Sequence, residues 1–452
     1  MNRRDFIKMT AGTSLAAMLA PAYAAEKPKQ PNLLIIHTDE HNFRTLGCYR
    51  KLLSKDQAFV WGEGVAVETP NIDWIAEQGA TCTSFYATSP VCSPSRSSFV
   101  SGKYPQSTPV VGNDIPMRDD TITFAEVLRR GGYATGYAGK WHLDGRGKPQ
   151  WGPKRQFGFA DNRYMFNRGH WKKLKDTPDG PRVAAGTDKR PSYAVDGADE
   201  KSFTTDFLAQ KTIDFIDAHS AKPFCYMLSI PDPHGPNTVR APYDTMYNHL
   251  KFQLPKTANK STEGLPSWAT KSGGNKMNAK QMSLYFGMVK CIDDNVGRIL
   301  KTLREKEILD NTIIVFTADH GDMCFEHARH NKQIPLEASA KIPFVIHCPT
   351  KVKAGTVVRE AMGCVDFMPT ILRLMGQKPA DTEEGRDCSE LLISGKAPMD
   401  WNDIVFFRQG GKNEEAWVGA VTQRYKLVLS SDDKPWLYDL AEDADELVNY
   451  YD

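Results

Sequence analysis

Short apolar runs recur along the chain, and each is followed at once by polar residues. Four such runs, rich in Ile, Val, Phe and Tyr, span residues 33–38, 133–139, 224–230 and 313–318. Runs of this length and composition are typical of strands that are buried on both faces of a sheet. The pattern therefore predicts four buried strands, with charged side chains just beyond their carboxyl ends.

Helical periodicity fills the intervals between these strands. Apolar residues recur at helical spacing after Pro70, after Thr123, within 207–216 and within 282–303. Strands that alternate with helices predict an α/β fold, in which a mainly parallel sheet has helices on both faces. Ligands bind beyond the carboxyl ends of the strands in such sheets. We therefore expect the four polar clusters to form one shared site.

The alternation of strands and helices fades after about residue 376. Segments 403–407, 417–422 and 426–429 have the character of antiparallel strands instead. We therefore predict a main domain, which carries the four polar clusters, over residues 25–376 and a small C-terminal subdomain over residues 377–452.

The N-terminus resembles an export signal. The heptapeptide NRRDFIK at residues 2–8 resembles the twin-arginine box, a mildly apolar stretch follows at 9–19, and Ala-Tyr-Ala at 22–24 fits a cleavage site. An ordinary first helix is the alternative. We predict a twin-arginine-type signal peptide over residues 1–24 and a periplasmic or secreted mature protein.

The composition narrows the class of partner. The 452 residues carry a formal net charge of only +2, which does not favour nucleic acid or a membrane surface as the main partner. No apolar run after the N-terminal segment is long enough to cross a bilayer. The nine cysteines are an odd number without CxxC pairs or zinc spacing, so at least one stays unpaired in an exported protein.

The pentapeptide CSPSR at residues 92–96 is the first candidate for chemistry. It follows the strand-like residues 82–86, and a serine at the cap with a proline in the first turn predicts the start of a helix. Cys92 would then lie at a helix N-terminus, where the dipole stabilises negative charge and lowers the pKa of a thiol. Arg96 adds a cation about one turn further on, which suits an anionic ester. The motif alone also fits a buried structural cysteine.

Two pairs of potential metal ligands lie at the ends of two predicted strands. They are Asp39 with Glu40, and Asp319 with His320. Three carboxylates favour a hard divalent cation such as Ca²⁺ or Mg²⁺, while the single imidazole also allows zinc. Each pair by itself fits a helix cap or a surface ion pair, but two pairs at equivalent strand ends predict a metal site.

Cationic and proton-transferring side chains accompany the other strand ends. Lys140 and His142 follow one strand, His234 follows another, and Lys332 lies further along the chain. An anionic substrate needs cations to hold it, and an alkoxide leaving group needs a proton donor. These residue types match that task, although each alone also fits a solvated or structural position.

Together the motifs resemble the formylglycine-dependent sulfatases of the alkaline-phosphatase-like superfamily. The resemblance rests, in chain order, on PNLL at 31–34, CSPSR at 92–96, SGKYP at 101–105, GKWHL at 139–143, PHGP at 233–236, DHGD at 319–322, His327, Lys332, Glu337, KIP at 341–343 and WLYDL at 436–440. It implies an α/β/α sandwich with a mainly parallel central sheet and a small C-terminal antiparallel subdomain. It also implies hydrolysis of sulfuric esters.

The resemblance implies a modified nucleophile and a bound cation. In this family a maturation enzyme oxidises the motif cysteine, here Cys92, to formylglycine. One hydroxyl of the aldehyde hydrate attacks sulfur, and the other expels sulfate as the aldehyde re-forms. Asp39, Glu40, Asp319 and His320 would hold the cation together with residue 92, with Ca²⁺ as the leading ion and Mg²⁺ as the alternative. Many relatives have aspartate at the position of Glu40 and asparagine at that of His320.

The resemblance also implies roles for the remaining candidates. Arg96 would stabilise the hydrate. Lys140 and Lys332 would grip the sulfate. His142 would assist the elimination step, and His234 would protonate the leaving alcohol.

Two rival functions remain open at this point. The nearest is a phosphonate or phosphate monoester or diester hydrolase on the same fold. Two-metal phosphatases need more Asp and His ligands than we can place at the strand ends, whereas phosphonate monoester hydrolases share the formylglycine. A secreted carbohydrate-binding protein with a dead site would lack one of Cys92, Arg96, His142 or Lys332, and none is missing.

One basic, aromatic-rich segment bears on the substrate. Residues 145–201 contain 13 Lys or Arg against 7 Asp or Glu, and seven aromatic residues, which are Trp151, Phe157, Phe159, Tyr164, Phe166, Trp171 and Tyr193. Aromatic rings stack on sugars and cations meet sulfate groups, although the segment also fits a solvated loop. We therefore predict a sulfated sugar as substrate, either an algal polysaccharide fragment or a glycosaminoglycan unit.

Overall fold

The computed structural model describes five stretches of the chain. They are residues 30–187, 189–259, 264–270, 273–410 and 416–451. The part from Pro31 to Asp452 forms one compact unit. The predicted signal peptide lies outside the described residues, so its prediction stays as it is.

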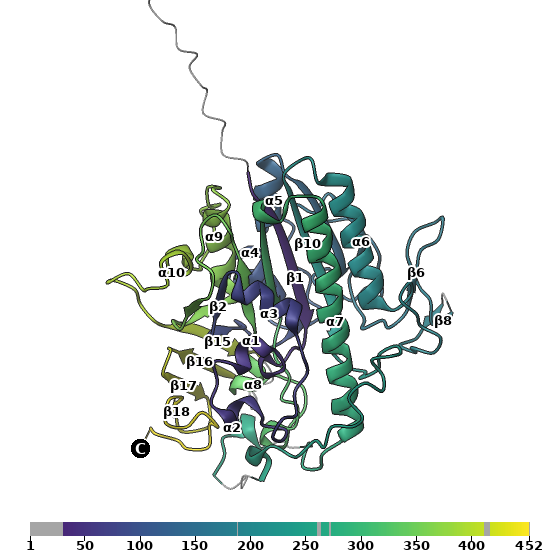
Figure 1. Cartoon of the computed structure of the whole chain (residues 1–452). Coiled ribbons are helices and arrows are strands. Elements are labelled where there is room, and N and C mark those ends of the chain that lie inside the picture. The colour runs from purple at the N-terminus through teal and green to yellow at the C-terminus, as the bar shows by residue number, and fades with distance from the viewer. Residues whose placement is uncertain (1–29, 188, 260–263, 271–272, 411–415, 452) are drawn as a thin grey trace, which may run out of the picture. The chain divides into compact units, whose positions relative to one another are not determined.

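An eight-stranded sheet runs through the centre of this unit (Figure 1), in the order β13-β2-β12-β11-β1-β10-β4-β5. Its strands are β1 (Asn32–Asp39), β2 (Ala80–Cys82), β4 (Ala134–Lys140), β5 (Asp161–Phe166), β10 (Phe224–Pro233), β11 (Thr312–Ala318), β12 (Phe344–His347) and β13 (Thr356–Val358). β12 pairs antiparallel to both neighbours and all other pairings are parallel. The four predicted strands correspond to β1, β4, β10 and β11, so the mainly parallel sheet is confirmed.

Helices cover both faces of the sheet (Figure 1). The long ones are α3 (Pro70–Glu77), α4 (Cys92–Ser101), α5 (Phe124–Arg130), α6 (Thr204–His219), α7 (Ala279–Glu305) and α9 (Cys364–Leu374). Alternate residues of β1 enter opposite cores, with Leu33 and Ile35 packing beneath α4, α5 and α9. Leu34 and Ile36 pack beneath α3, α6 and α7. The four predicted helices are therefore confirmed, and none of the described helices is long and apolar enough to cross a bilayer.

Short elements connect this frame. The short helices are α1 (Gly47–Arg50), α2 (Lys55–Ala58), α8 (Glu337–Ala340) and α10 (Ser389–Ser394). The short strands are β3 (Phe85–Tyr86), β6 (Leu174–Lys175), β7 (Arg182–Val183), β8 (Gly186–Thr187), β9 (Arg190–Pro191) and β14 (Met362–Gly363). The strand-like run at 82–86 is therefore split between β2 and β3, which belong to different sheets.

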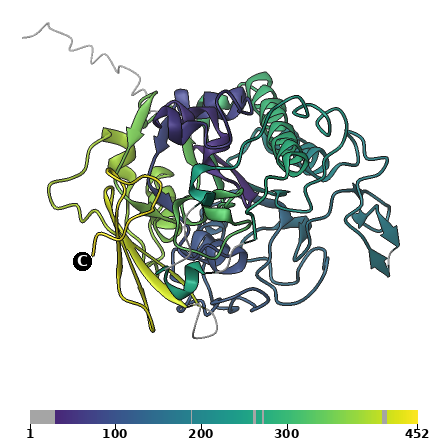
Figure 2. The same ribbon diagram turned by 90° about the horizontal axis from the view of Figure 1, so that it is seen from below.

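A second, antiparallel sheet lies near the C-terminus. Its strands are β15 (Val405–Gln409), β16 (Trp417–Val421), β17 (Tyr425–Ser430) and β18 (Trp436–Asp439), paired in that order. Figure 2 shows it as the yellow layer on one side of the unit, with the hairpin of β8 and β9 at the opposite side. The three predicted strands are confirmed, and β18 is a fourth that the strand pattern did not reveal.

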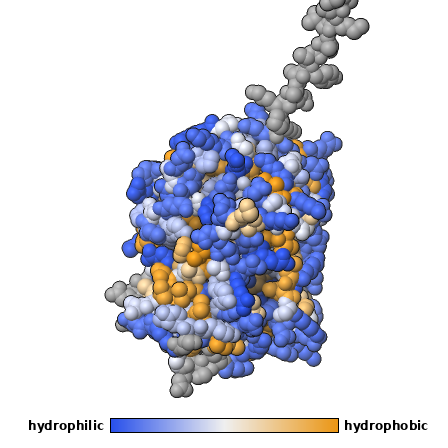
Figure 3. Space-filling view, turned by 90° about the vertical axis from the view of Figure 1, so that its left-hand side faces the viewer, coloured by the Kyte–Doolittle hydropathy of each residue, from blue (hydrophilic) through white to orange (hydrophobic). Residues whose placement is uncertain are grey.

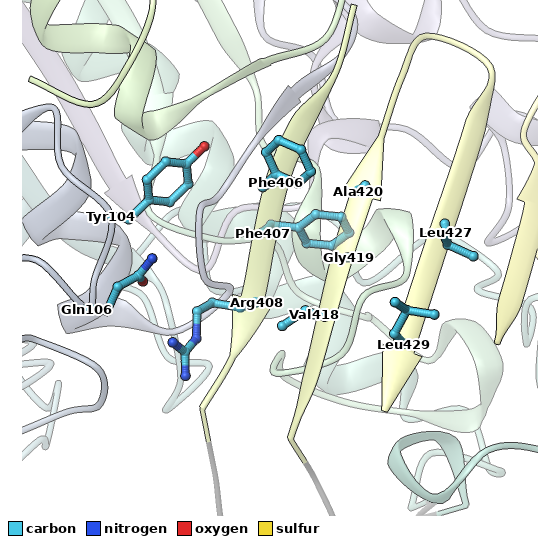
Figure 4. A pocket seen from close by; sticks show the side chains of 10 residues that line it. All are labelled: Tyr104, Gln106, Phe406, Phe407, Arg408, Val418, Gly419, Ala420, Leu427 and Leu429. Carbon is cyan, nitrogen blue, oxygen red and sulfur yellow. The ribbon is translucent and has the colours of Figure 1, made fainter. Parts of the chain in front are cut away.

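The outer face of this second sheet is apolar. Figure 3 shows the side of the molecule that carries it, where hydrophobic residues gather in patches on a mainly hydrophilic surface. Phe406 and Val418 are 53% and 52% exposed. With Leu427, Leu429 and the side chain of Tyr104 they border a hollow of about 530 Å³ (Figure 4). None of the predicted site residues lines this hollow.

The basic, aromatic-rich segment 145–201 packs differently from expectation. Phe157, Phe159, Phe166 and Trp171 are buried in the cores of the unit. The other three aromatic rings are half-buried. Most of these rings therefore stabilise the fold and do not form an exposed platform for sugars.

All nine cysteines are buried and free. The structure therefore contains no disulfide among them, in keeping with the odd count.

Candidate active site

The candidate site is formed where four central strands end. Asp39 and Lys140 are the last residues of β1 and β4. His234 directly follows β10, and Asp319 directly follows β11. Because the strands are parallel and adjacent, their carboxyl ends meet at one edge of the sheet. The structure thus brings the four polar clusters together.

The helix α4 delivers Cys92 to this edge. Cys92 is its first residue, and Val91 is the N-cap without a capping side chain. The prediction that Ser93 caps the helix was therefore wrong. Its hydroxyl instead donates to the backbone oxygen of His142 at 2.8 Å, and its N–H donates to Asn113 Oδ1 at 3.0 Å. Both bonds tie the start of the helix to loops around the site.

Cys92 is a neutral thiol in this environment. Its side chain is buried, and its Sγ lies 3.2 Å from His320 Nε2 and 3.9 Å from Asp39 Oδ1. Burial raises the pKa of Cys92 to about 11, although Lys140 acts in the opposite direction. The lowered thiol pKa expected at the helix N-terminus was therefore wrong, because loss of hydration outweighs the dipole and the nearby cation.

Four buried side chains form a group with the donors of a metal site. One ligand atom each from Asp39, Cys92, Asp319 and His320 lies within 4.8 Å of the others. The Nδ1–H of His320 donates to the backbone oxygen of Gly321 at 3.0 Å, so Nε2 faces the group as a lone pair. Two carboxylates, an imidazole and the side chain of residue 92 fit a divalent cation in chemistry and spacing.

Charged neighbours hold Asp39 ionised. Burial alone would raise its pKa, but Lys140, His234 and Arg96 outweigh that effect and hold the pKa of Asp39 well below its usual range. An ionised carboxylate is the form that a metal requires.

Glu40 turns away from this group. Its backbone has a positive φ of 61°, and its carboxylate lies 3.0 Å from His234 Nε2 and 3.0 Å from Lys332 Nζ. Burial raises the pKa of Glu40 to about 7, although Lys332 acts in the opposite direction. The structure thus places Glu40 beside the candidate proton donor, and its predicted role as a metal ligand stays a prediction.

Arg96 joins the two aspartates of the group. Its Nε donates to Asp319 Oδ2 at 2.9 Å and its Nη2 to Asp39 Oδ2 at 3.2 Å. Its Nη1 donates to the backbone oxygen of Lys140 and to Ser229 Oγ, each at 2.8 Å. Every nitrogen of the guanidinium therefore contacts a candidate ligand, the end of β4 or Ser229 within β10.

Two lysines contact the charged groups of the site. Lys140 Nζ forms an ion pair with Asp39 and lies 2.9 Å from His170 Nε2. Lys332 Nζ lies 2.7 Å from His234 Nε2. Both ammonium groups are almost entirely buried, so an anion that entered the site would meet desolvated cations.

His142 is a buried residue that follows β4 beside Lys140. Its backbone has a positive φ of 61°, and its Nε2 is 3.5 Å from Asp114 Oδ1. Burial, with Lys140 and Arg96, holds the pKa of His142 well below its usual range. A neutral imidazole of this kind has a lone pair with which to accept a proton.

Sequence reasoning missed two residues of the site. His170 stacks on His234, with ring centroids 3.6 Å apart and planes at 9°. Asp114 contacts His142 and forms an ion pair with Arg168 Nη1 at 3.0 Å. Neither belongs to a motif or follows a predicted strand, so only the folded loops reveal them.

Comparison with known proteins identifies the family. The family model described as Sulfatase matches residues 31–377, and the model described as N-sulphoglucosamine sulphohydrolase, C-terminal, matches residues 325–452. An N-acetylglucosamine-6-O-sulfatase of Bacteroides thetaiotaomicron is 27% identical, over 98% of this chain and 86% of that protein. An ulvan-active sulfatase of Formosa agariphila is 28% identical, over 84% of this chain and 68% of that protein.

Solved structures share the fold. A protein solved in complex with its substrate D-glucosamine-2-N,6-O-disulfate superimposes with a TM-score of 0.77 at 23% identity, covering 94% of each chain. A phosphonate monoester hydrolase of Agrobacterium radiobacter gives a TM-score of 0.69 at 22% identity, covering 93% of this chain and 91% of that chain. The fold is therefore the alkaline-phosphatase-like one, and the chain belongs to the sulfatase family of sulfuric ester hydrolases.

Proposed function

We propose that this sulfatase removes sulfate from a sulfated sugar, with an aldehyde form of residue 92 as its nucleophile. The observation that carries the proposal is the position of Cys92, buried at the start of α4 and surrounded by candidate metal ligands. The named activities of relatives, on N-acetylglucosamine 6-sulfate and on ulvan, support a sulfated carbohydrate such as a glycosaminoglycan unit or an algal polysaccharide fragment.

The neutral thiol of Cys92 is the reason to invoke the modification. A thiol with a pKa of about 11 is a poor nucleophile at neutral pH. A maturation enzyme that supplies a two-electron oxidant would convert the side-chain carbon to an aldehyde, with an oxygen atom entering at the level of water and the sulfur leaving as hydrogen sulfide. The hydrate of that aldehyde carries two hydroxyls, one to attack and one to expel the product.

In the first step, one hydroxyl of the hydrate attacks sulfur and the bond from sulfur to the alcohol oxygen breaks. The alcohol needs a proton, and we assign its delivery to His234. The Nδ1–H of His234 donates to the backbone oxygen of Gly235 at 2.9 Å, so Nε2 is the atom that faces the site. Lys332 Nζ donates to this nitrogen at 2.7 Å and the Glu40 carboxylate lies 3.0 Å from it, so these two groups would supply the proton that Nε2 then passes to the alcohol.

In the second step, the other hydroxyl of the hydrate loses its proton. The bond between its carbon and the sulfate oxygen breaks, the aldehyde re-forms, and sulfate leaves. We assign the proton acceptor to His142, because burial keeps its imidazole neutral and Asp114 lies beside its Nε2. Lys140 and Lys332 hold the anion through both steps.

A divalent cation completes the proposal. Asp39, Asp319, His320 and residue 92 would bind it, with Ca²⁺ as the leading ion and Mg²⁺ as the alternative. When bound, the ion would polarise the sulfate oxygens and lower the pKa of the attacking hydroxyl. Arg96 keeps both aspartates turned toward that position.

Two further parts of the proposal concern location and the alternative reaction. We propose export to the periplasm or beyond through the twin-arginine-type segment at residues 1–24.

Phosphonate monoester hydrolysis is the second candidate function, because a hydrolase of that class shares the fold over 93% of this chain.

Mass spectrometry of the active enzyme tests the nucleophile. We expect the peptide that contains residue 92 to be about 18 Da lighter than the cysteine form, as an aldehyde requires. Unmodified cysteine in fully active enzyme would refute the mechanism. Cys92→Ala serves as the inactive control.

Paired substrates test the role of His234 and the reaction class. We expect His234→Ala to lose about 100-fold or more of its activity on sugar sulfates, but far less on aryl sulfates with good leaving groups, because only the former need a proton donor. Equal losses would argue against the acid role. Faster turnover of phenylphosphonate than of any sulfate ester would favour the alternative function.

A further inference from the structure

His170 contacts two groups of the proposed reaction centre at once. Its ring stacks nearly parallel on His234, with centroids 3.6 Å apart. Its Nε2 lies 2.9 Å from Lys140 Nζ and 3.8 Å from Asp39 Oδ2. No other described residue both stacks on His234 and contacts Lys140.

The backbone around His170 is fixed to the strand that carries His234. The next residue, Trp171, is buried, and its indole N–H donates to the backbone oxygen of Arg168 at 3.0 Å. Lys172 is also buried, and its Nζ lies 2.6 Å from Asp232 Oδ1 and 3.1 Å from the backbone oxygen of His234. The segment therefore follows the end of β10 as one rigid piece, and His170 keeps its place relative to His234.

The ammonium of Lys140 defines the chemical state of the contact. An ammonium only donates, so Nε2 of His170 accepts and its proton is on Nδ1. Asp39, His170 and His234 also have the spacing of a metal-binding group. Lys140 Nζ already contacts both Asp39 and His170. Its ammonium therefore supplies the positive charge that these side chains would otherwise find in a metal ion.

We propose that His170 is a positioning residue for the reaction. Through Nε2 it directs the ammonium of Lys140, and through its face it holds the plane of His234. The face-to-face contact restricts rotation of His234, whose Nε2 delivers the proton under the proposed function on which this inference rests. His170 itself needs no contact with the substrate.

Two substitutions separate the two contacts. His170→Phe keeps a flat ring over His234 but removes the acceptor for Lys140, so we expect KM for sulfate esters to rise about tenfold with little change in kcat. His170→Gln keeps a polar acceptor but removes the stacked ring. We expect it to lower kcat about tenfold on sugar sulfates and to leave kcat on an activated aryl sulfate within about threefold.

A matched control is available in His219. It is also half-buried and stacked on an aromatic ring, that of Phe215, with centroids 4.1 Å apart. It ends α6 and precedes the start of β10, at the edge of the sheet opposite the site. We expect His219→Phe to leave both kcat and KM unchanged on both substrates.

The outcomes distinguish this inference from the proposed function. If His234→Ala discriminates between the two substrates and His170→Gln does not, the positioning role of His170 is refuted while the acid role stands. If His234→Ala affects both substrates equally, the acid role fails first. A ¹⁵N spectrum of the histidines in the unsubstituted enzyme gives a test that needs no variant: we expect the Nδ1–H form of His170, and the Nε2–H form would overturn the contact with Lys140.

Discussion

Lys426 gives a sharp test of what joins the C-terminal sheet to the rest of the enzyme. It lies on the inner face of β17 with a fully buried side chain. Its Nζ is 2.6 Å from Glu337 Oε1, 2.7 Å from Glu446 Oε1 and 3.0 Å from the backbone oxygen of Pro335. Glu337 belongs to α8 and Pro335 to the loop before it, so this ammonium links the two parts of the unit.

The loss of stability expected for Lys426→Met depends on the cations that remain near the two glutamates. Removal of one partner from a buried ion pair costs about 3–5 kcal/mol, because a buried charge loses its compensation. Glu337 keeps Lys341, whose Nζ is 2.7 Å away. The cost therefore falls mainly on Glu446, and we expect the low end, about 3 kcal/mol of the free energy of unfolding.

Calorimetry measures this change with an internal control. The compact unit spans residues 31–452, so an unfolding entropy of about 2.1 cal/mol/K per residue gives roughly 0.9 kcal/mol/K and a fall in Tm of about 3 °C. Arg424→Ala removes the ion pair with Asp439, in which the arginine is half-exposed, and should lower Tm by less than about 1 °C. The double variant Lys426→Met with Glu446→Gln should recover most of the loss, because a neutral amide then replaces the buried carboxylate that lost the charge of Lys426.

Two results would refute this reasoning. A Tm for Lys426→Met equal to that of Arg424→Ala would mean that the buried ammonium is not needed. A double variant no more stable than Lys426→Met would mean that lost packing, and not the charge of Glu446, is the cause.

Four other predictions follow from the same structure. Removal of divalent metal with a chelator should lower Tm, and Ca²⁺ should restore it. Ca²⁺ at 100 times its Kd should add about 2.7 kcal/mol to the free energy of unfolding, whereas an unchanged Tm contradicts the metal site. Arg96→Lys should weaken Ca²⁺ binding in calorimetric titration by about 10-fold or more, because a single ammonium does not hold both aspartates; equal affinity contradicts that role. Lys341 and Lys426 outweigh burial and hold the pKa of Glu337 well below its ordinary value of 4.5, so its contribution to stability is complete above that pH and is lost as the pH falls toward the folded pKa. Glu337→Gln should therefore flatten the acid limb of the curve of Tm against pH, and an unchanged limb refutes this. Phe406→Ser should reduce retention on a phenyl column without loss of activity, because the ring is 53% exposed on the apolar face; unchanged retention would show that this face is not accessible.

The sequence predicted the central strands and the residues at their ends, because there the local pattern of apolar residues follows directly from burial in the sheet. The central strands are buried on both faces, so they read as unbroken apolar runs, and their ends locate Asp39, Lys140, His234 and Asp319 without knowledge of any loop. The topology of the parallel sheet then brings these strand ends together, whatever the details of the side chains.

Features that depend on loops and on burial were out of reach. His170 reaches the site only because Lys172 anchors its segment to Asp232, which no spacing reveals. Glu40 turns toward His234 because its backbone has a positive φ. The pKa of Cys92 reflects complete desolvation, whereas the sequence shows only the nearby helix start and the cation.

The burial of Cys92 also imposes an order of events on the life of the protein. Only 2% of this residue is exposed, and all ten residues of α4 are buried. An oxidising enzyme with a pocket of its own needs several residues of extended chain around its target, so the proposed maturation competes with folding. Under the proposed mechanism, molecules that pack α4 before oxidation would keep an unmodified Cys92 and would be inactive. The yield of active enzyme would then depend on whether oxidation precedes folding during synthesis. A twin-arginine route, which carries folded chains, would export modified and unmodified molecules alike.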